Sequence, residues 1–288
     1  MRVDVLVLGG GVVGTALALS LAMKGRSVAM IERGNPGGET SFGNAGLIQS
    51  EAVMPYPFPR DPFLLVQYAL NLKAEAHYHL RDVFHVAPYL WRYFRASSRA
   101  GQLKTAAANV PIFGACLEEH RKLAAAAGVE SMLRPGGWMK VFRTQKTFET
   151  EAAKTLADLA PFGVEAVMLD RKGIAEREPN ISDAAIGGVH FTAPWSLNDP
   201  QALTLAYARH FESLGGKIIN GNAMTLEERH DGWAVKTTEG IISAPDCVVA
   251  LGPWAPDLLR PMGYRVPMGV KRGYHVHMRP KGNARLGI

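Results

Sequence analysis

Three glycines near the N-terminus, Gly9, Gly11 and Gly14, constrain the fold more than any other feature of the sequence. They separate a short apolar run, residues 3–8, from a second apolar segment, residues 12–23, whose pattern predicts a helix. Strand, tight turn and helix in this order are the context in which a Gly-x-Gly-x-x-Gly pattern binds a dinucleotide. The first glycine permits the sharp turn, the second the approach of a pyrophosphate, and the third close packing of helix on strand.

The residues around this turn predict how a nucleotide would lie. Val12 and Val13 open the helix, whose free amides and partial positive charge suit phosphate groups. Residues 27–31 form a second β-type run that ends in Glu32, whose carboxylate can accept hydrogen bonds from ribose hydroxyls. The same charge repels a 2′-phosphate and argues against NADP. Arg33 follows directly and is included in the predicted site.

The uncharged stretch from residue 5 to residue 23 also resembles a membrane span or a signal-peptide core in length. The glycines interrupt it where a spanning helix needs continuity. Asp4 precedes it, at the place where a signal peptide carries positive charge. We therefore interpret the stretch as strand, turn and helix.

Composition limits the remaining classes of protein. A chain of 288 residues that is 47% hydrophobic and 20% charged is globular and long enough for about two domains. Cys116 and Cys247, its two cysteines, lie far apart and offer neither a disulfide framework nor a thiolate metal cage. This favours a reduced, cytoplasmic setting. The net charge of +6 is spread along the chain, so no nucleic-acid surface is predicted.

The loop after the second strand distinguishes FAD from NAD. Its small residues, amides and hydroxyls can follow a diphosphate and approach a flat ring. Here the sequence resembles the D-amino acid oxidase-like superfamily of FAD-dependent oxidoreductases, and within it the D-amino acid dehydrogenases. That family carries a Thr-Ser-x-x-Asn-Ala/Gly-Gly stretch beside the flavin, and residues 40–46 match it. The resemblance implies non-covalent FAD with contacts from Thr40, Ser41, Asn44, Ala45, Gly46 and Leu47.

The resemblance also implies an α/β fold in which a Rossmann-like FAD-binding domain carries an inserted α+β substrate domain. The apolar patterns of the middle segment predict a mixed sheet covered by helices, with strands at 136–142 and 186–191 and helices at 106–127 and 145–160. The expected organisation is FAD-binding domain at 1–54, substrate domain at 55–197, FAD-binding domain again at 198–262, and the start of a return to the substrate domain at 263–288.

Aromatic residues and arginines alternate near helical spacing between residues 89 and 99. We interpret this stripe as a helix that packs on its own domain through Tyr89, Leu90, Tyr93 and Phe94. Arginines on such a helix extend outward. The alternative is a face that contacts a membrane surface, where cationic and aromatic residues act together.

The segment after residue 198 is expected to return to the cofactor. Asp199 and Pro200 predict a helix start, and the glycines at 215 and 216 predict its end. Further β-type runs follow at 217–219, 223–227, 233–237, 241–243 and 247–251. The resemblance implies that this part contributes Met224, Ala250, Gly252 and Trp254 to the dinucleotide site.

The implied reaction is oxidative deamination of D-amino acids, in which a hydride passes from the substrate α-carbon to the flavin and the imine is hydrolysed to a 2-oxo acid. A glycine or sarcosine-type amine oxidase and a non-catalytic flavin-binding product are the alternatives. The electron acceptor is expected to be oxygen, a quinone or a respiratory chain component. The expected location is cytoplasmic, with membrane contact at most peripheral, at the inner face of the cell membrane.

The end of the sequence departs from the family pattern. The family's Gly-x-Arg-Pro motif does not occur, so we expect an N-terminal portion with little dehydrogenase activity by itself. A last strand is expected at 273–278, with Tyr274 and His275 as candidate substrate contacts, and no catalytic residue is assigned. The histidine pairs 77/79 and 275/277 have metal-ligand spacing, but no third ligand accompanies them, so no metal site is predicted.

Overall fold

The glycine-rich turn follows the first strand of a four-stranded parallel sheet. The computed structural model describes residues 1–73, 79–269, 273–276, 282, 284 and 286–288. The sheet has the order β13-β1-β2-β9, and every pairing in it is parallel. Its strands are β1 (Val5–Leu8), β2 (Val28–Glu32), β9 (Lys217–Asn220) and β13 (Asp246–Val249). The Rossmann-like α/β architecture predicted from the sequence is confirmed.

Each face of this sheet buries a different set of side chains. Val5 and Val7 pack with helices α1 (Val12–Met23) and α8 (Pro200–Ser213), where Tyr207 and Phe211 are completely buried. Leu6 and Leu8 point to the opposite face, as alternation along a strand requires. That face is covered by the antiparallel meander β10 (Glu227–Arg229), β11 (Gly232–Thr237) and β12 (Gly240–Ala244). Helix α9 (Ala255–Leu259) also contributes to this cover.

Local signals account for the ends of the helices in this part. Helix α1 begins and ends as the sequence predicts. The Asp199 carboxylate accepts a hydrogen bond from the Ala202 amide at 2.8 Å and caps α8 as predicted. The expected β-type run at 223–227 is wrong in its first part. The Asn222 side chain accepts from the Met224 amide at 3.0 Å and holds η5 (Ala223–Thr225) as a 3₁₀ turn before β10.

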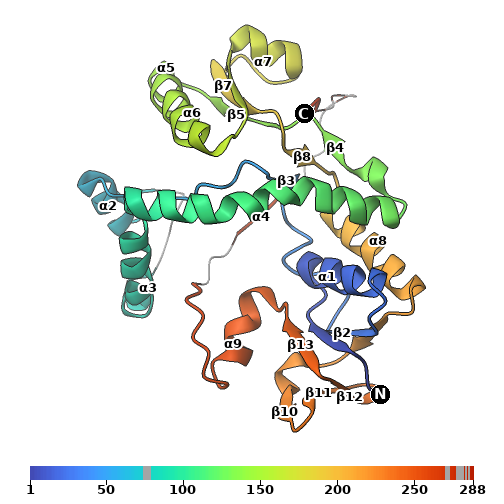
Figure 1. Ribbon diagram of the computed structural model, residues 1–288. Coiled ribbons are helices and arrows are strands. Elements are labelled where there is room, and N and C mark those ends of the chain that lie inside the picture. The colour runs from blue at the N-terminus through green and yellow to red at the C-terminus, as the bar shows by residue number, and fades with distance from the viewer. Residues whose placement is uncertain (74–78, 270–272, 277–281, 283, 285) are drawn as a thin grey trace.

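A second group of strands lies at the other end of the molecule (Figure 1). The sheet β5-β7-β6 is built from Trp138–Phe142, Gly187–Phe191 and Ala166–Asp170. Both of its pairings are antiparallel, so the prediction of a mixed sheet is wrong for the described residues. Short helices pack beside it: α5 (Gln145–Thr147), η3 (Phe148–Ala152), α6 (Ala153–Leu159), η4 (Ala160–Phe162) and α7 (Arg171–Arg177).

A small sheet and a long helix join the two ends. The small sheet has the order β3-β8-β4, with strands Leu47–Ile48, Trp195–Ser196 and Arg134–Pro135. Helix α4 (Arg99–Ala126) runs across the middle of the molecule and leads into η2 (Glu130–Met132) (Figure 1). It starts earlier than predicted because the Ser98 hydroxyl caps it, accepting from the Gly101 amide at 3.1 Å.

Helices α2 (Pro62–Ala69) and α3 (Val83–Ala96), with η1 (Leu80–Asp82) before α3, extend to one side of α4 (Figure 1). In α3 the rings of Tyr93 and Phe94 contact Phe58, at 5.4 and 5.9 Å between centroids, so these two residues pack as predicted. The Tyr89 ring, although 39% exposed, lies 6.2 Å from that of Tyr93 between centroids and packs against Gly269, whereas Leu90 is 36% exposed and the prediction is wrong for it. No helix in the described part of the chain has the length and apolar character needed to cross a bilayer.

The sequence-based division into domains stays a prediction. Strands from 1–54 and 198–262 share the parallel sheet, and 55–197 supplies the whole antiparallel sheet β5-β7-β6. The expected last strand is absent from residues 273–276, which have no regular secondary structure, and residues 277 and 278 lie outside the described part.

The contact between Gly14 and the Gly9 carbonyl leads to a first prediction. A Cβ atom on Gly14 would overlap the Gly9 carbonyl oxygen and lie 3.2 Å from the Ala250 Cβ. We expect Gly14→Ala to lower the free energy of unfolding by about 1–3 kcal/mol, because helix and strand must move apart. Urea denaturation measures this change.

The matched control is Gly114→Ala in α4, where an added Cβ meets nothing within 4 Å. A methyl there is expected to raise the free energy of unfolding by about 0.5–1 kcal/mol, since alanine is the better helix former. Similar effects of the two substitutions would show that close packing at Gly14 does not matter.

Candidate functional site

The main cleft lies where all four strands of the parallel sheet end. It has a volume of about 490 Å³ and is lined by residues that follow β1, β2, β9 and β13. Ligands of open α/β sheets bind at this carboxyl edge. Most of the predicted site residues line it: Gly9, Gly11, Val12, Val13, Glu32, Arg33, Thr40, Ser41, Met224, Ala250, Gly252 and Trp254.

A second cavity, of about 250 Å³, adjoins the first at Val12, which lines both. The remaining residues of the predicted loop line it: Asn44, Ala45, Gly46 and Leu47. The other lining residues come from β3, from the turn before α8 and from α8 itself. His120 adds a contribution from α4. The predicted FAD-binding residues are therefore divided between two neighbouring cavities, except for Gly14, which packs α1 on β1.

The Glu32 carboxylate is held in place by two backbone amides. Its Oε2 accepts from the Gly10 amide at 2.6 Å, and its Oε1 accepts from the Gly34 amide at 2.9 Å. A carboxylate can accept about four hydrogen bonds, so each oxygen keeps acceptor capacity for a ligand hydroxyl. The side chain is fixed before any ligand arrives, which reduces the entropy cost of binding.

The N-terminus of α1 forms the floor between the two cavities. The Val12 amide donates to the Ser41 hydroxyl at 3.0 Å, which satisfies one of the free amides of the first turn. A Cβ on Gly11 would meet only the Ser41 hydroxyl, at 3.5 Å, so the backbone at Gly11 is open to a ligand. Bare backbone, a helix N-terminus and a hydroxyl together suit a diphosphate.

The polar groups of Asn44 bond to the backbone of its own loop. Its amide nitrogen donates to the Ser41 carbonyl at 3.0 Å, and its oxygen accepts from the Gly46 amide at 2.7 Å. Gly46 has a φ of +67° and lies against the Leu197 carbonyl, a position that a side chain would block. These contacts explain why this loop combines asparagine and glycine at this spacing.

Arg33 and Trp254 join two walls of the main cleft. The guanidinium lies 4.4 Å from the centroid of the indole ring, within the range of a cation–π interaction. Arg33 also pairs with Glu39 at 2.9 Å. The segment after β2 is thereby connected to the turn η6 (Gly252–Trp254) after β13.

The candidate substrate contacts line neither cavity. Tyr274 is 88% exposed, and the His275 ring contacts Phe42 edge-on, at 5.8 Å between centroids. His275 also lies against Gly43, within the predicted flavin loop at residues 40–46. Their role stays a prediction.

No metal centre is seen in the part of the chain that the structure describes, where no three histidine, cysteine or acidic side chains could hold an ion. His79 and His275 belong to this part, but their proposed partners, His77 and His277, lie outside it.

Sequence reasoning missed several residues of the cleft and cavity. The lining residues after β2 and β9 could have been found from the sequence, because turns rich in glycine and asparagine follow the predicted strands there. His120 carried no such signal, since it comes from a helix distant in sequence. The missed lining residues are Asn35, Gly37, Gly38, Glu39, Gly221, Asn222, Ala223, Val249, Leu251, Pro253, Ala255, Ile48, Gln49, His120, Leu197, Pro200 and Leu203.

Comparison with known proteins identifies the family. Residues 4–287 match the family DAO, described as FAD dependent oxidoreductase. This chain belongs to that family. FAD is therefore its cofactor, as the sequence predicted.

Two relatives of known name are similar over almost the whole chain. A D-amino-acid oxidase of Bradyrhizobium diazoefficiens is 29% identical over 94% of this chain and 65% of its own length. A D-amino acid dehydrogenase of Rhizobium johnstonii is 31% identical over 94% of this chain and 66% of its own length. The chain thus spans about two thirds of the length of these relatives.

The fold is also that of solved flavoenzymes. The crystal structure of glycine oxidase from Geobacillus kaustophilus matches 91% of this chain and 58% of its own, with a TM-score of 0.62 and 21% identity. This likeness confirms the predicted fold.

The residues that line the two cavities suit the chemistry of FAD, with a carboxylate for a ribose and open backbone for a diphosphate. We propose that Glu32 accepts from the ribose of the adenosine, and that the open backbone at Gly11 holds the diphosphate. The loop from Asn44 to Leu47 would then border the flavin ring in the second cavity.

The second prediction concerns Glu32. Glu32→Gln keeps the shape of the side chain but removes its charge and one acceptor for the backbone and the ribose. We expect the dissociation constant of FAD to rise about ten- to a hundred-fold, because hydrogen bonds to a charged group are worth about 1.5–3 kcal/mol. Titration of apoprotein with FAD, followed by flavin fluorescence, measures it.

Glu228→Gln serves as the control, because Glu228 is exposed on β10 and lines neither cavity. This variant should bind FAD like the wild type. An unchanged affinity in Glu32→Gln would remove Glu32 from the adenosine site.

Proposed function

We propose that this protein deaminates D-amino acids oxidatively with FAD. The observation that carries the proposal is the similarity to D-amino acid oxidase and dehydrogenase relatives at about 30% identity over 94% of the chain. The paired cavities support it, because they provide places for a dinucleotide and for a ring beside it. A glycine oxidase-type specificity is the second candidate, favoured by the structural likeness to such an enzyme.

The chemistry divides between cofactor and protein. FAD, when bound, would supply a two-electron oxidant: the amino acid would lose a hydride from its α-carbon and a proton from its amine, and water would hydrolyse the imine to a 2-oxo acid and ammonia. The chain's own residues would bind and orient the cofactor: Glu32 and the turn at Gly11 would hold its nucleotide end, and the loop at Asn44 to Leu47 would border its ring. Because such placement turns a bimolecular reaction into an intramolecular one, it contributes a large part of the rate.

A dye-reduction assay tests this proposal. FAD-loaded protein is mixed with a panel of D-amino acids, their L-enantiomers, glycine, sarcosine and D-lactate. Because the chain spans about two thirds of its relatives, the assay uses both the 288-residue chain and the same chain extended by the C-terminal third of the Rhizobium relative.

We expect the extended protein to reduce the dye with D-amino acids at least tenfold faster than with their L-enantiomers. Glycine and sarcosine should be poorer substrates. A preference for glycine or for an L-amino acid in both proteins would contradict the proposed specificity and would select the second candidate or another amine oxidase.

We further propose that the electron acceptor is a quinone in a membrane that α2 and α3 contact from its surface. Large apolar side chains are exposed on these helices, with Phe63 at 72%, Phe84 at 86% and Trp91 at 61%. Exposed arginines, Arg92 and Arg95, accompany them on α3. Aromatic residues and cations together favour the interface of an anionic bilayer.

The corresponding experiment is cosedimentation with vesicles of phosphatidylglycerol and phosphatidylcholine. Phe84→Ala should weaken binding about tenfold or more, since burial of one large apolar side chain is worth about 1.5–3 kcal/mol. Ile241→Ala, which removes an exposed side chain from β12, should leave it unchanged. Equal binding by both variants, or no binding by the wild type, would contradict membrane contact.

A further inference from the structure

His120 of α4 lines the second cavity. It lies on the helix that crosses the molecule, far in sequence from the loop at residues 44–49 that forms the opposite wall. Its Nδ1 is 3.2 Å from the hydroxyl of Tyr207 on α8, and the two rings stack with centroids 6.3 Å apart. Tyr207 is completely buried, so this contact fixes the orientation of the imidazole.

The surroundings determine the charge of both groups. Burial lowers the pKa of His120 and raises the pKa of Tyr207. The imidazole is therefore neutral at pH 7, and the phenol keeps its proton. A neutral imidazole has one donor nitrogen and one acceptor nitrogen.

The contact with Tyr207 can be made by either tautomer of the imidazole. The Tyr207 hydroxyl can donate to Nδ1 of His120 at 3.2 Å or to the backbone carbonyl of His120 at 3.3 Å. Donation to the carbonyl corresponds to a proton on Nδ1, which then donates to the phenol oxygen, because a neutral imidazole has one donor and one acceptor nitrogen. Donation to Nδ1 leaves the imidazole proton on Nε2.

Other polar side chains of the cavity wall are engaged by the protein. Both polar groups of Asn44 bond to the backbone of its own loop, and the amide nitrogen of Gln49 donates to Glu51 at 2.9 Å. Nε2 of His120, in contrast, has no hydrogen-bond partner within the described residues. With the proton on Nε2, this nitrogen is a donor that the described residues leave without an acceptor.

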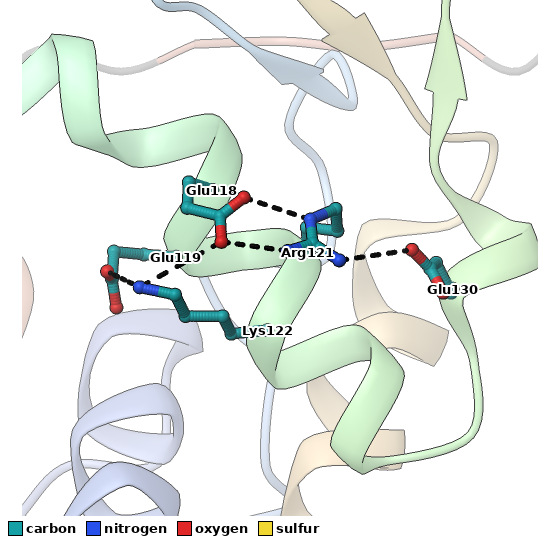
Figure 2. A network of polar contacts seen from close by, with 5 residues as sticks. All are labelled: Glu118, Glu119, Arg121, Lys122 and Glu130. Atoms are coloured by element: carbon teal, nitrogen blue, oxygen red, sulfur yellow. Dashed lines mark hydrogen bonds and ion pairs between the residues drawn. The ribbon is translucent and has the colours of Figure 1, made fainter.

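Ion pairs restrain the turn of α4 that carries this donor (Figure 2). Arg121 binds Glu118 through two hydrogen bonds of 2.9 and 2.8 Å and reaches Glu130 in η2 at 4.0 Å. Lys122 pairs with Glu119 at 2.8 Å. Each pair is exposed and weak by itself. The pairs involve residues on both sides of His120 in the sequence, and the contact of Arg121 with Glu130 joins this turn of α4 to η2.

We propose that His120 donates a hydrogen bond from Nε2 to a polar edge atom of the bound flavin ring, and that Tyr207 is the positioning residue that fixes this tautomer. The proposal rests on the placement of the flavin ring in the second cavity. It adds a contact from α4, outside the glycine-rich turn and the loop at residues 40–47.

A measurement without cofactor tests the tautomer. Two-bond ¹H–¹⁵N correlation spectra of ¹⁵N-histidine apoprotein distinguish a proton on Nε2 from one on Nδ1. We expect the Nε2–H form for His120 in the wild type and a mixture in Tyr207→Phe. An Nδ1–H form in the wild type would overturn the proposed donor.

A second measurement tests the contact with the flavin. His120→Leu should weaken FAD about two- to tenfold, the effect of one neutral hydrogen bond, and should shift the flavin absorption bands and midpoint potential. His120→Gln keeps a hydrogen-bond donor and should restore part of the FAD affinity, the absorption bands and the midpoint potential. Tyr207→Phe should give values between those of the wild type and those of His120→Leu. His210→Leu is the control, because His210 bonds to Ser213 at the end of α8 and lines neither cavity.

The outcomes separate this inference from the proposed function. An unchanged flavin spectrum, potential and affinity in both His120 variants would overturn the contact and leave D-amino acid deamination standing. Wild-type protein that bound FAD normally but deaminated no D-amino acid would overturn the proposed function and leave the His120 contact standing. A His120→Leu variant that does not fold leaves His120→Gln and Tyr207→Phe to decide.

Discussion

The contact of Gly14 with the Gly9 carbonyl is the constraint on which the rest of the structure depends. It brings α1 against β1 so closely that the N-terminus of the helix lies at the carboxyl edge of the sheet. Glu32 then reaches the Gly10 amide from the end of the next strand. A side chain at residue 14 would separate helix and strand and move the amides of the first turn away from this carboxylate.

Parallel pairing explains how distant segments form one site. β1, β2, β9 and β13 all end at the same edge, so turns more than 200 residues apart, such as those at Gly9 and Gly252, line one cleft. The interaction of Arg33 with Trp254 connects two of these turns directly. The second cavity is lined by residues of α4 and α8, two helices distant in sequence, so it forms only when these helices pack together. The contact of His120 with Tyr207 is part of that packing.

The sequence predicts those features that depend on local chemistry. Helix α1 lies between the glycine turn and Gly25, and α8 begins at the Asp199 cap, because backbone geometry and capping act over a few residues. The failures depend on tertiary contacts. Periodicity could not show that Leu90 of α3 stays exposed, nor that β7 pairs antiparallel with both neighbours. His120 was missed because no local pattern distinguishes a cavity-lining histidine from others on a helix.

Hydrogen exchange of the backbone amides with and without FAD tests the central claim, that the glycine turn and the cavities beside it hold the cofactor. We predict slower exchange with FAD at residues 9–13, 32–49, 221–224 and 249–255, the segments that contribute most of the lining of the two cavities. Exchange in α3 should not change, because that helix lines neither cavity. Protection by FAD confined to other segments, or equal protection of the same amides by NADP, would contradict the account.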